Sequence, residues 1–423
     1  DKPVLIACKT VIGYGAPNKG GTSGVHGSAL GAAEVAAARE FLGWSAEPFV
    51  IPDEIAAAWK AIGAKGSDVR AAWEERLAAH ADKAEFERRV AGELPADFSL
   101  SAYIDTLIAN PQKVATRKAS ELALGAINDL LPETLGGSAD LTGSNNTKTK
   151  STGPLTRDDY AGRYVYYGIR EFGMACAMNG MALHGGVIPY GGTFLVFSDY
   201  CRPSIRLAAL MGAHTIFVMT HDSIGVGEDG PTHQPIEQLA ALRAIPNLLV
   251  MRPADGVETA ECWQIAMESK SNPSLLALSR QDTILAHDSH TAENLSARGA
   301  YVLREAPGAK LTLLATGTEV GLALQARGLL AAEGIAARIV SMPCWALFEK
   351  QPADYQRMVL GAPGAARLGI EAACPLGWDR YLGEKGAFLG MHGFGASGPA
   401  KDVYAHFGIT AEAAVQMAKD LLK

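Results

Sequence analysis

Short apolar runs alternate with longer amphipathic segments over most of the chain. The runs at residues 215–219, 248–251 and 275–278 are candidate strands, and a second series follows at residues 311–315, 338–341 and 367–370. Segments of helical length with one apolar face separate them. Short buried strands that alternate with helices are typical of a parallel sheet covered by helices. The pattern therefore predicts an α/β protein with two such sheets in succession.

The amino-terminal part of the chain follows a different order. Val4 to Cys8 form an apolar run that predicts an interior strand, and a Gly-rich loop leads from it into an Ala-rich helix over residues 32–42. Two more helices are predicted, one opening at Asp53 and the next opening at Ser67 and continuing to about Glu93. Side-chain oxygens at such positions cap free N–H groups, and acids favour a first helical turn.

Residues 94–112, which include Pro95 and Pro111, are typical of a linker that crosses between domains. The predicted division is residues 1–93, this linker, and two α/β domains at residues 113–292 and 293–423. A length of 423 residues agrees with two or three domains, because a single hydrophobic core rarely grows to that size.

Composition places the chain among globular proteins, with 48% hydrophobic and 20% charged residues. No run approaches the roughly 18 apolar residues of a membrane span, and the first residues show no signal pattern. A cytoplasmic protein is the resulting prediction. The net charge of −7 argues against a nucleic-acid surface, which needs clustered Lys and Arg. The six cysteines lack the paired spacing of a zinc or redox motif.

The densest polar cluster directly follows a predicted strand, where α/β sheets place their ligands. Residues 220–235 read Thr-His-Asp-Ser-Ile-Gly-Val-Gly-Glu-Asp-Gly-Pro-Thr-His-Gln-Pro. The glycines match the Gly-x-Gly-x-x-Gly fingerprint of nicotinamide dehydrogenases, but two carboxylates would repel a pyrophosphate and the prolines delay the helix that should receive it. Two histidines and an aspartate favour another task, that of orienting a hydroxylated substrate. Each histidine alone could instead satisfy loop carbonyls.

Two further segments contain candidate chemistry. Glu171 opens an apolar helix, where it is either an acid favoured by the helix dipole or a carboxyl group that exchanges protons with a heterocyclic nitrogen. Phe194, Phe197 and Tyr200 place an aromatic at every third position. Such a stripe is typical of a core, and it equally suits a cradle for a planar ring.

Three strings together resemble the transketolase family: Arg-Glu-Phe-Gly-Met, Pro-Tyr-x-x-Thr-Phe-x-x-Phe and His-Asp-Ser-Ile-Gly-x-Gly-Glu-Asp-Gly-Pro-Thr-His-Gln-Pro. The likeness covers nearly the whole chain. It implies a thiamine-diphosphate-binding fold followed by a carboxyl-terminal α/β domain. It also implies reversible transfer of a two-carbon ketol unit from a ketose phosphate to an aldose phosphate. By this resemblance Glu171 pairs with N1′ of the cofactor's aminopyrimidine and drives deprotonation of the thiazolium C2, whose carbanion is the nucleophile.

The resemblance assigns the remaining cofactor and reaction contacts. Phe194, Phe197 and Tyr200 would enclose the pyrimidine ring. Asp140 would lie beside the thiamine. His26 would reach the reacting centre as a cofactor-binding and catalytic residue, although the Ser-Gly-Val stretch before it departs from the commoner family pattern.

The resemblance also assigns two groups of substrate contacts. Asp229 and His233 would contact the ketose hydroxyls and the developing oxyanion, so that His233 is also catalytic. The phosphate end would be formed by Arg117, Ser144, His221 and Arg280. An Arg guanidinium suits this work because its planar fork matches phosphate oxygens.

The resemblance breaks at the metal site. Family members hold the cofactor diphosphate through a divalent metal, Mg²⁺ or Ca²⁺, bound by a Gly-Asp-Gly motif and a later Asn, and this motif does not occur in the sequence. The chain is therefore expected to lack part of the diphosphate-binding domain, to supply no metal ligands and to need the missing segment for activity. A separate partner chain, a proteolytic remnant and a shortened expression product would each account for this.

A homodimer is expected, because the family's site lies between the diphosphate domain of one protomer and the pyrimidine domain of the other. Two alternatives to transketolase remain open. A deoxyxylulose-phosphate synthase or a dehydrogenase component shares the fold and the catalytic Glu. The second alternative is a noncatalytic subunit of a split enzyme. The presence of Glu171, the aromatic trio and both loop histidines argues against a purely structural role.

Overall fold

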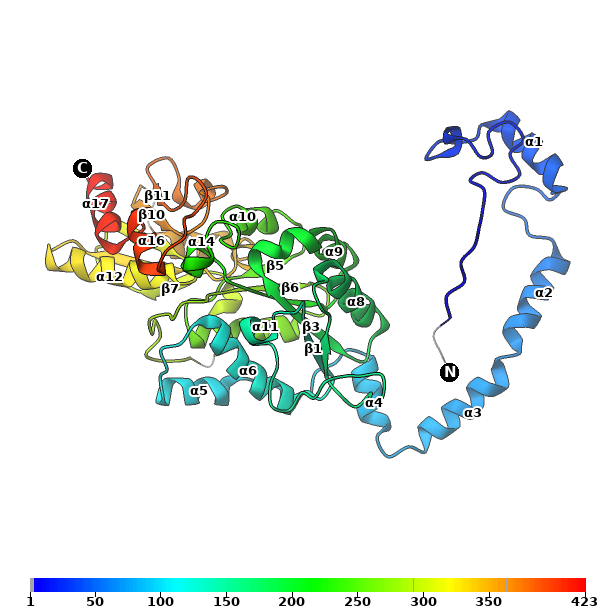
Figure 1. Cartoon of the computed structure of the whole chain (residues 1–423), viewed down its shortest axis with the longest axis horizontal. Helices are drawn as coiled ribbons and strands as arrows, with labels where there is room; N and C mark the ends of the chain where they lie inside the picture. Colours follow the sequence, from blue (N-terminus) through cyan, green and yellow to red (C-terminus); the bar gives the residue numbers. More distant parts are fainter. Residues whose placement is uncertain (1–3, 292, 362–363) are drawn as a thin grey trace. The chain divides into compact units, whose positions relative to one another are not determined.

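The computed structural model describes residues 4–291, 293–361 and 364–423. It divides the chain into two compact units, Asp1–Lys83 and Ala84–Lys423, which are described separately (Figure 1).

The first unit consists of helices joined by loops. Its helices are α1 (Ala32–Leu42), α2 (Asp53–Ala64) and α3 (Ser67–Ala78), which begin where the sequence predicts. The Gly-rich loop is tied to α1 by the carboxylate of Glu34, which accepts the backbone N–H groups of Asn18 and Lys19, each at 2.9 Å.

Two predictions for the amino-terminal part are wrong. Residues 4–8 form no strand. A strand must pair with a second strand to satisfy its backbone N–H and C=O groups. The described part of this unit contains no strand with which residues 4–8 could pair. The third helix does not continue to Glu93, because it ends at Ala78 and a separate helix, α4 (Lys83–Val90), follows. Between them the ring Nδ1 of His80 accepts the backbone N–H of Asp82 at 3.1 Å and forms a turn.

The second unit begins with a parallel sheet of strand order β2-β1-β3-β4-β6-β5. Its strands are β1 (Thr134–Ser138), β2 (Tyr164–Tyr166), β3 (Ile188–Phe194), β4 (Ile216–Thr220), β5 (Leu249–Met251) and β6 (Ser274–Leu278).

Helices cover both faces of this sheet (Figure 1). One face is covered by α6 (Thr116–Leu130) and α11 (Gly256–Glu268), and the other by α8 (Glu171–His184) and α9 (Ser198–Met211). On β4, Val218 packs in a cluster with Trp263 of α11, while Phe217 packs in a cluster with Met178 of α8. Successive strand residues point to opposite faces, so both faces of the strand are apolar. Helix α5 (Ser101–Ala109) occupies much of the predicted linker and packs against α11.

The carboxyl-terminal domain, by which we mean the elements from β7 to α17, contains a second sheet of order β11-β10-β8-β9-β7. Its strands are β7 (Tyr301–Arg304), β8 (Leu311–Ala315), β9 (Ala337–Ser341), β10 (Ala366–Ile370) and β11 (Ala387–Leu389). Strand β7 pairs antiparallel with β9, whereas the other pairs are parallel. One face packs on α12 (Glu319–Ala332) and α17 (Ala411–Leu421), and the other on α13 (Trp345–Phe348), α14 (Ala353–Leu360) and α15 (Asp379–Leu382).

All six strand positions predicted for the two sheets fall on strands of these sheets, which confirms the α/β fold. The six positions do not include every strand of the two sheets. Strand β3 was missed because a strand that contains a proline and two glycines departs from the usual composition. The glycines are required by close packing. A Cβ at Gly191 would lie 2.4 Å from Met178 Sδ, and one at Gly192 would lie 2.8 Å from Thr147 Cγ2. Among the helices that the structure describes, none is long and apolar enough to cross a membrane.

Candidate active site

The carboxyl ends of three neighbouring strands lie side by side. Phe194 of β3 pairs in register with Thr220 of β4, and Thr220 pairs with Leu278 of β6. The loops that leave these strands therefore gather at one edge of the sheet, where parallel α/β sheets place their ligands. These loops carry five of the predicted site residues, namely Phe197, His221, Asp229, His233 and Arg280. We call residues 221–234, which follow β4, the histidine loop.

The predicted aromatic residues and both loop histidines form one cluster at this edge. Phe194 stacks on His221 with ring centroids 3.6 Å apart and on Phe197 at 5.5 Å. The ring of His233 meets Phe197 edge-on at 5.4 Å, and Tyr200 lies 5.7 Å from Phe197. Tyr200 is 65% exposed, so this side of the cluster faces outward.

His221 is buried and held in a left-handed backbone conformation, with φ +62°. Non-glycine residues rarely adopt this conformation, and functional sites are where such strain concentrates. Burial lowers the pKa of His221 to about 3, and the positive charges of Arg117 and Arg280 add to the effect. The imidazole is therefore neutral at physiological pH.

A chain of hydrogen bonds fixes the ring of His221. Ser138 Oγ donates to Asn145 Oδ1 at 2.8 Å, and Asn145 Nδ2 donates to Thr220 Oγ1 at 2.7 Å. Thr220 Oγ1 in turn lies 2.8 Å from Nδ1 of His221. Sequence analysis assigned no role to Ser138, Asn145 or Thr220, because each is an ordinary polar residue at the end of a strand or of a short helix. The position of Thr220 directly before the histidine loop was the available signal.

Two guanidinium groups lie near His221. Arg117 Nη1 donates to the backbone oxygen of Ser144 at 2.9 Å. Burial lowers the pKa of Arg117, and the charge of Arg280 lowers it further, so the two cations are close enough to repel each other. Arg280 Nη1 lies 4.0 Å from a carboxylate oxygen of Glu228. The four residues predicted to form a phosphate end are thus brought together, with Ser144 contacting Arg117 through its main chain.

Glu171 is the first residue of α8 and is 9% exposed. Its carboxylate makes no hydrogen bond or ion pair with the residues that the structure describes. Burial raises the pKa of the Cys201 thiol to about 12, and the charge of Glu171 contributes to that rise, which places Glu171 near the turn of α9 that carries Tyr200. A nearly buried acid without a protein donor therefore lies near Cys201, the residue that follows Tyr200.

The remaining predicted residues lie on exposed segments. Asp229 ends the short helix η3 (Ile224–Asp229) in the histidine loop, and Asp140 follows β1 with φ +61°. His26 belongs to the first unit, where it follows η1 (Ser23–Val25) and is exposed.

Three sequence-family models match parts of the chain. A sequence model described as "Transketolase, pyrimidine binding domain" matches residues 112–284. Models described as "Transketolase-like TK C-terminal domain" and "Transketolase, thiamine diphosphate binding domain" match residues 299–410 and 1–95. The chain belongs to the transketolase family.

Several transketolases are similar to the chain over most of its length. A transketolase of Cereibacter sphaeroides is 60% identical over 420 residues, which are 99% of this chain and 64% of that protein. One of Sinorhizobium medicae is 56% identical over 426 residues, which are 100% of this chain and 61% of that protein. The chain thus spans less than two thirds of the length of these relatives.

Solved transketolase structures have the same fold. The structure of "Transketolase from Leishmania mexicana" superimposes with a TM-score of 0.89 at 41% identity, covering 97% of this chain and 61% of that one. A structure named "Split gene transketolase, inactive beta4 tetramer" has a TM-score of 0.59 at 25% identity and covers 73% of this chain and 98% of that one.

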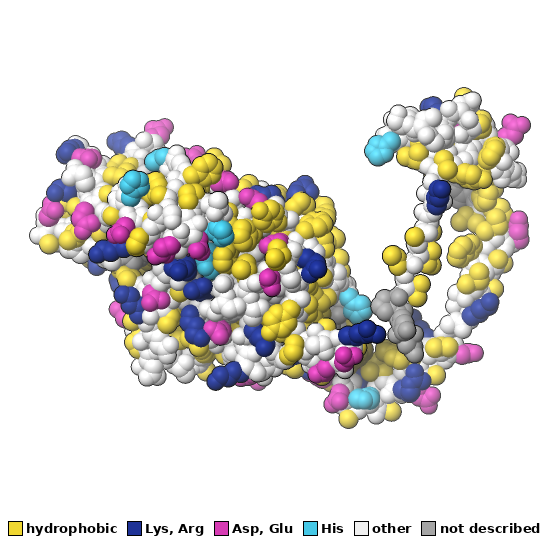
Figure 2. Space-filling view, in the orientation of Figure 1, with side chains coloured by type: hydrophobic (Ala, Val, Ile, Leu, Met, Phe, Trp, Pro, Cys, Tyr) yellow, Lys and Arg dark blue, Asp and Glu magenta, His cyan; other side chains and the backbone are white. Residues whose placement is uncertain are grey.

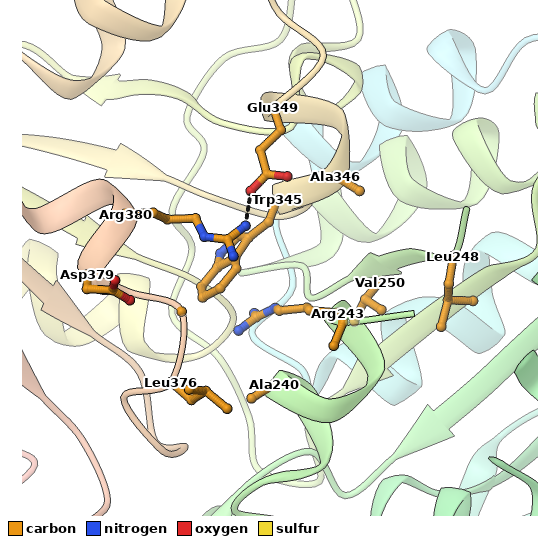
Figure 3. A pocket seen from close by; sticks show the side chains of 12 residues that line it. Ala240, Arg243, Leu248, Val250, Trp345, Ala346, Glu349, Leu376, Asp379 and Arg380 are labelled. Carbon is orange, nitrogen blue, oxygen red and sulfur yellow. Dashed lines mark hydrogen bonds and ion pairs between the residues drawn. The ribbon is translucent and has the colours of Figure 1, made fainter. Parts of the chain in front are cut away.

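Among the described residues, no group of three or more His, Cys, Asp or Glu side chains is arranged to hold a metal ion. A separate pocket of about 270 Å³ lies between α10 (Gln238–Arg243) and the carboxyl-terminal domain, and Figure 3 shows Arg243, Trp345 and Arg380 lining it. None of the predicted site residues lines this pocket.

Proposed function

We propose that this chain is part of a transketolase and carries the residues that act on the cofactor's pyrimidine ring and on the sugar phosphates. The proposed reaction is the reversible transfer of a two-carbon ketol unit from a ketose phosphate to an aldose phosphate, a transferase reaction. The observation that carries the proposal is that Glu171, the aromatic cluster and the two loop histidines all lie on segments that follow the carboxyl ends of strands in one parallel sheet. Membership of the transketolase family supports it.

The residues present fit the aminopyrimidine of thiamine diphosphate. A nearly buried carboxylate without a protein partner suits a ring nitrogen, and the adjacent aromatic side chains suit a planar ring. Thiamine diphosphate, when bound, supplies the carbon nucleophile that takes up the two-carbon unit. Glu171 would hold a proton at N1′ of the pyrimidine. Phe194, Phe197 and Tyr200 would contact the ring, and we assign Asp140 and His26 to the thiamine side.

The neighbouring residues fit a sugar phosphate. Arg117, Arg280, His221 and Ser144 would bind its phosphate, because two nearby guanidinium groups attract an anion even on a chain of net charge −7. Thr220 accepts a hydrogen bond from Asn145, which leaves its own hydroxyl proton for Nδ1 of His221. The ring proton of His221 is then at Nε2, where it can be donated to substrate oxygen. Asp229 and His233 would contact the ketose hydroxyls.

The proposal also includes a divalent metal ion. We propose that Mg²⁺ or Ca²⁺ neutralises the cofactor diphosphate, and that the Gly-Asp-Gly ligands come from a segment outside the printed sequence. Activity would then require that segment, on the same polypeptide or on a partner chain. The structure named for a split-gene transketolase supports the second arrangement as one that the family uses.

We also propose a homodimer that covers an apolar face of α8 and α9. This face exposes several large hydrophobic side chains, and Figure 2 shows hydrophobic side chains gathered on the side of the second unit that carries these helices. The exposed residues are Ile169, Phe172, Leu183, Leu207, Leu210 and Met211. Patches of this kind mark protein interfaces. Leu210→Glu should therefore give a monomer at micromolar concentration, whereas an unchanged sedimentation coefficient would argue against this face.

The test is calorimetry of thiamine diphosphate with Mg²⁺, followed by a ketol-transfer assay. Both are performed on the chain alone and after mixing with a chain that supplies the Gly-Asp-Gly segment. Tight binding and ketol transfer only in the mixture are expected. Glu171→Gln should retain the fold and lower ketol transfer at least about 100-fold, because general acid–base groups contribute roughly that much. Cofactor binding without any ketol transfer in the mixture would favour a noncatalytic subunit instead.

A further inference from the structure

The histidine loop is held by the carboxyl-terminal domain, which contributes none of the predicted site residues. Gln234 Nε2 donates to the backbone oxygen of Gly227 at 3.0 Å within the loop and to that of Ala396 at 2.9 Å in the other domain. Ser397 Oγ donates to the backbone oxygen of Glu228. Two main-chain segments about 165 residues apart are thereby fixed to each other.

A second contact begins at Tyr404 of α16 (Ala400–His406). Its hydroxyl donates to Glu319 Oε1 at 2.7 Å and lies 3.2 Å from Ser223 Oγ. Ser223 Oγ accepts the backbone N–H of Gly225 at 3.2 Å and so caps η3. Burial and the charge of Glu319 raise the pKa of Tyr404, so its proton remains in place at physiological pH. The cap of η3 thus depends on a side chain from the carboxyl-terminal domain.

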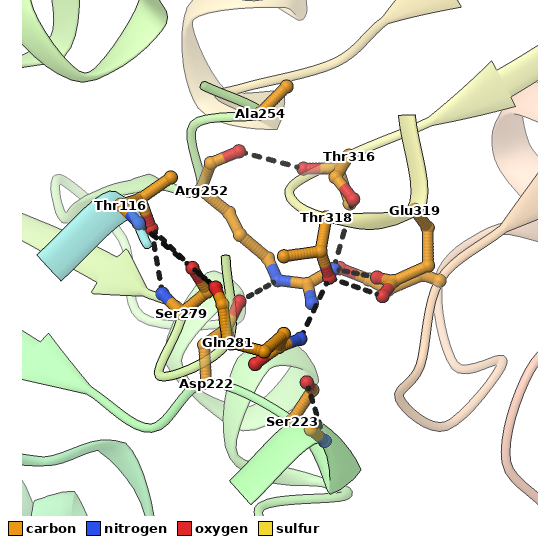
Figure 4. Close-up of polar contacts among 12 residues, drawn as sticks. Thr116, Asp222, Ser223, Arg252, Ala254, Ser279, Gln281, Thr316, Thr318 and Glu319 are labelled. Atoms are coloured by element: carbon orange, nitrogen blue, oxygen red, sulfur yellow. Dashed lines mark hydrogen bonds and ion pairs between the residues drawn. The ribbon is translucent and has the colours of Figure 1, made fainter. Parts of the chain in front are cut away.

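A buried ion pair network joins the start of the histidine loop to α12 (Figure 4). Arg252 Nε donates to Asp222 Oδ2 at 2.8 Å, and Arg252 Nη1 pairs with Glu319 of α12. Asp222 directly follows His221, and all three charged side chains are at most 2% exposed. The left-handed turn at His221 is therefore anchored on one side by Thr220 and on the other by Asp222.

The two surfaces also fit sterically. A Cβ at Gly227, where φ is +81°, would lie 3.2 Å from the backbone oxygen of Gly398. A Cβ at Gly395 would lie 1.8 Å from Gln234 Oε1. The loop and the carboxyl-terminal domain approach too closely for side chains at these points.

We propose that the carboxyl-terminal domain sets the position of the histidine loop, and that Tyr404, Glu319 and Ser397 are positioning residues for His221, Asp229 and His233. They act through the loop and touch no substrate. The proposal rests on the function proposed above for the loop, since its consequence for the reaction is the placement of the ketose. Its structural part, the ordering of the loop by Tyr404, is measurable without any activity.

The first test compares Tyr404→Phe with Tyr355→Phe. Tyr355 of α14 is a matched control, because its half-buried hydroxyl donates to the backbone oxygen of Ala300 at 3.0 Å and does not contact the loop. Hydrogen–deuterium exchange of peptides from residues 221–234 should become about fivefold faster in Tyr404→Phe, as expected for the loss of one net hydrogen bond. Tyr355→Phe should leave these peptides within about twofold of the unmodified protein.

The second test uses the ketol-transfer assay on the same variants. Tyr404→Phe should raise the KM for the ketose phosphate about fivefold and change kcat less than about twofold, because the loop orients bound substrate. Ser397→Ala should have a smaller effect in the same direction, which Ser397→Thr should reverse by restoring the hydroxyl.

The outcomes separate the two proposals. Unchanged loop exchange in Tyr404→Phe, or an equal increase in Tyr355→Phe, would overturn the positioning role. Faster exchange with an unchanged KM would overturn its link to the substrate. Absence of ketol transfer by the unmodified protein in the presence of the Gly-Asp-Gly segment would count against the proposed function, while the exchange comparison would still decide whether the loop is held in this way.

Discussion

Replacement of Arg252 by Met should destabilise the second unit more than any ordinary surface change. Arg252 is fully buried and makes ion pairs with Asp222 and Glu319, which are 2% and 0% exposed. Although burial opposes its charge, the carboxylates of Glu319 and Asp222 raise the pKa of Arg252, so it is a cation in the folded protein. Its removal leaves two acids in the interior without a counter-charge. Loss of one partner from a buried pair costs about 3–5 kcal/mol.

The loss of stability in Arg252→Met should come more from the unpaired charges than from changed packing. Met fills a volume close to that of the Arg stem, so the cavity contribution should stay below about 1.5 kcal/mol. Glu371 lies 3.5 Å from Arg252 but keeps two hydrogen bonds of 2.8 Å from Arg243, so it contributes little to the loss. The double variant Arg252→Met with Glu319→Gln should recover about 2 kcal/mol relative to additivity, because it removes both charges of the shorter pair.

Urea denaturation followed by tryptophan fluorescence measures these differences. Arg357→Met is the matched control, since Arg357 pairs with Asp354 at the surface, where the two side chains are 65% and 91% exposed. This control should lose less than about 1 kcal/mol. A loss below about 1 kcal/mol for Arg252→Met, or no recovery in the double variant, would show that the buried network does not stabilise the fold as argued.

Three further predictions concern single residues. Burial alone would lower the pKa of His287, but Asp255, whose Oδ2 lies 2.9 Å from its Nδ1, raises it to about 9. Because this folded-state pKa exceeds the unfolded value of about 6.5, the pair should add about 3 kcal/mol to the free energy of unfolding. This contribution is fully present below pH ~6.5 and is lost as the pH rises through 9. In His287→Gln the midpoint of urea denaturation should therefore no longer fall over this pH range. His221 should show no change in its ring NMR shifts above about pH 5, because its pKa is about 3, and a midpoint near 6.5 would contradict its burial. Gly299→Ala should lower the free energy of unfolding by at least about 2 kcal/mol more than Gly308→Ala. Both positions have positive φ, but only a Cβ at Gly299 would meet backbone atoms, at 2.1 Å. Equal thermal unfolding midpoints for the two variants would refute this prediction.

The sequence predicted the fold because the strand signals are local. The run at residues 311–315 coincides with β8, and the other apolar runs match their strands within one residue. Where the signal depends on a neighbour, prediction failed. Residues 4–8 have strand composition and form no strand, while β3 has poor strand composition and lies inside the sheet. Pairing partners decide both cases, and a single segment does not show them.

The candidate site was predictable for a related reason. Its residues lie in dense polar strings after apolar runs, and parallel strands bring such strings to one edge. The groups that fix these residues were not predictable. Asn145 lies 75 residues before Thr220, and Tyr404 lies 181 residues after Ser223, so no local pattern connects them. The candidate site residues could therefore be predicted from the sequence. The residues that hold them in place could not, because tertiary contacts alone bring them together.

The distance along the chain between the histidine loop and its anchors has a consequence for protein synthesis. The contacts between the histidine loop and residues 396–404 span 162 to 181 residues. At a translation rate of about 5–20 residues per second, the ribosome needs roughly 8–36 s to make the anchors after it has made the loop. The first sheet can pair during that interval, but the loop lacks these partners until residues 396–404 have been made. A nascent chain that stops before Ala396 would thus carry a complete first sheet with a histidine loop that lacks its contacts to Ala396, Ser397 and Tyr404.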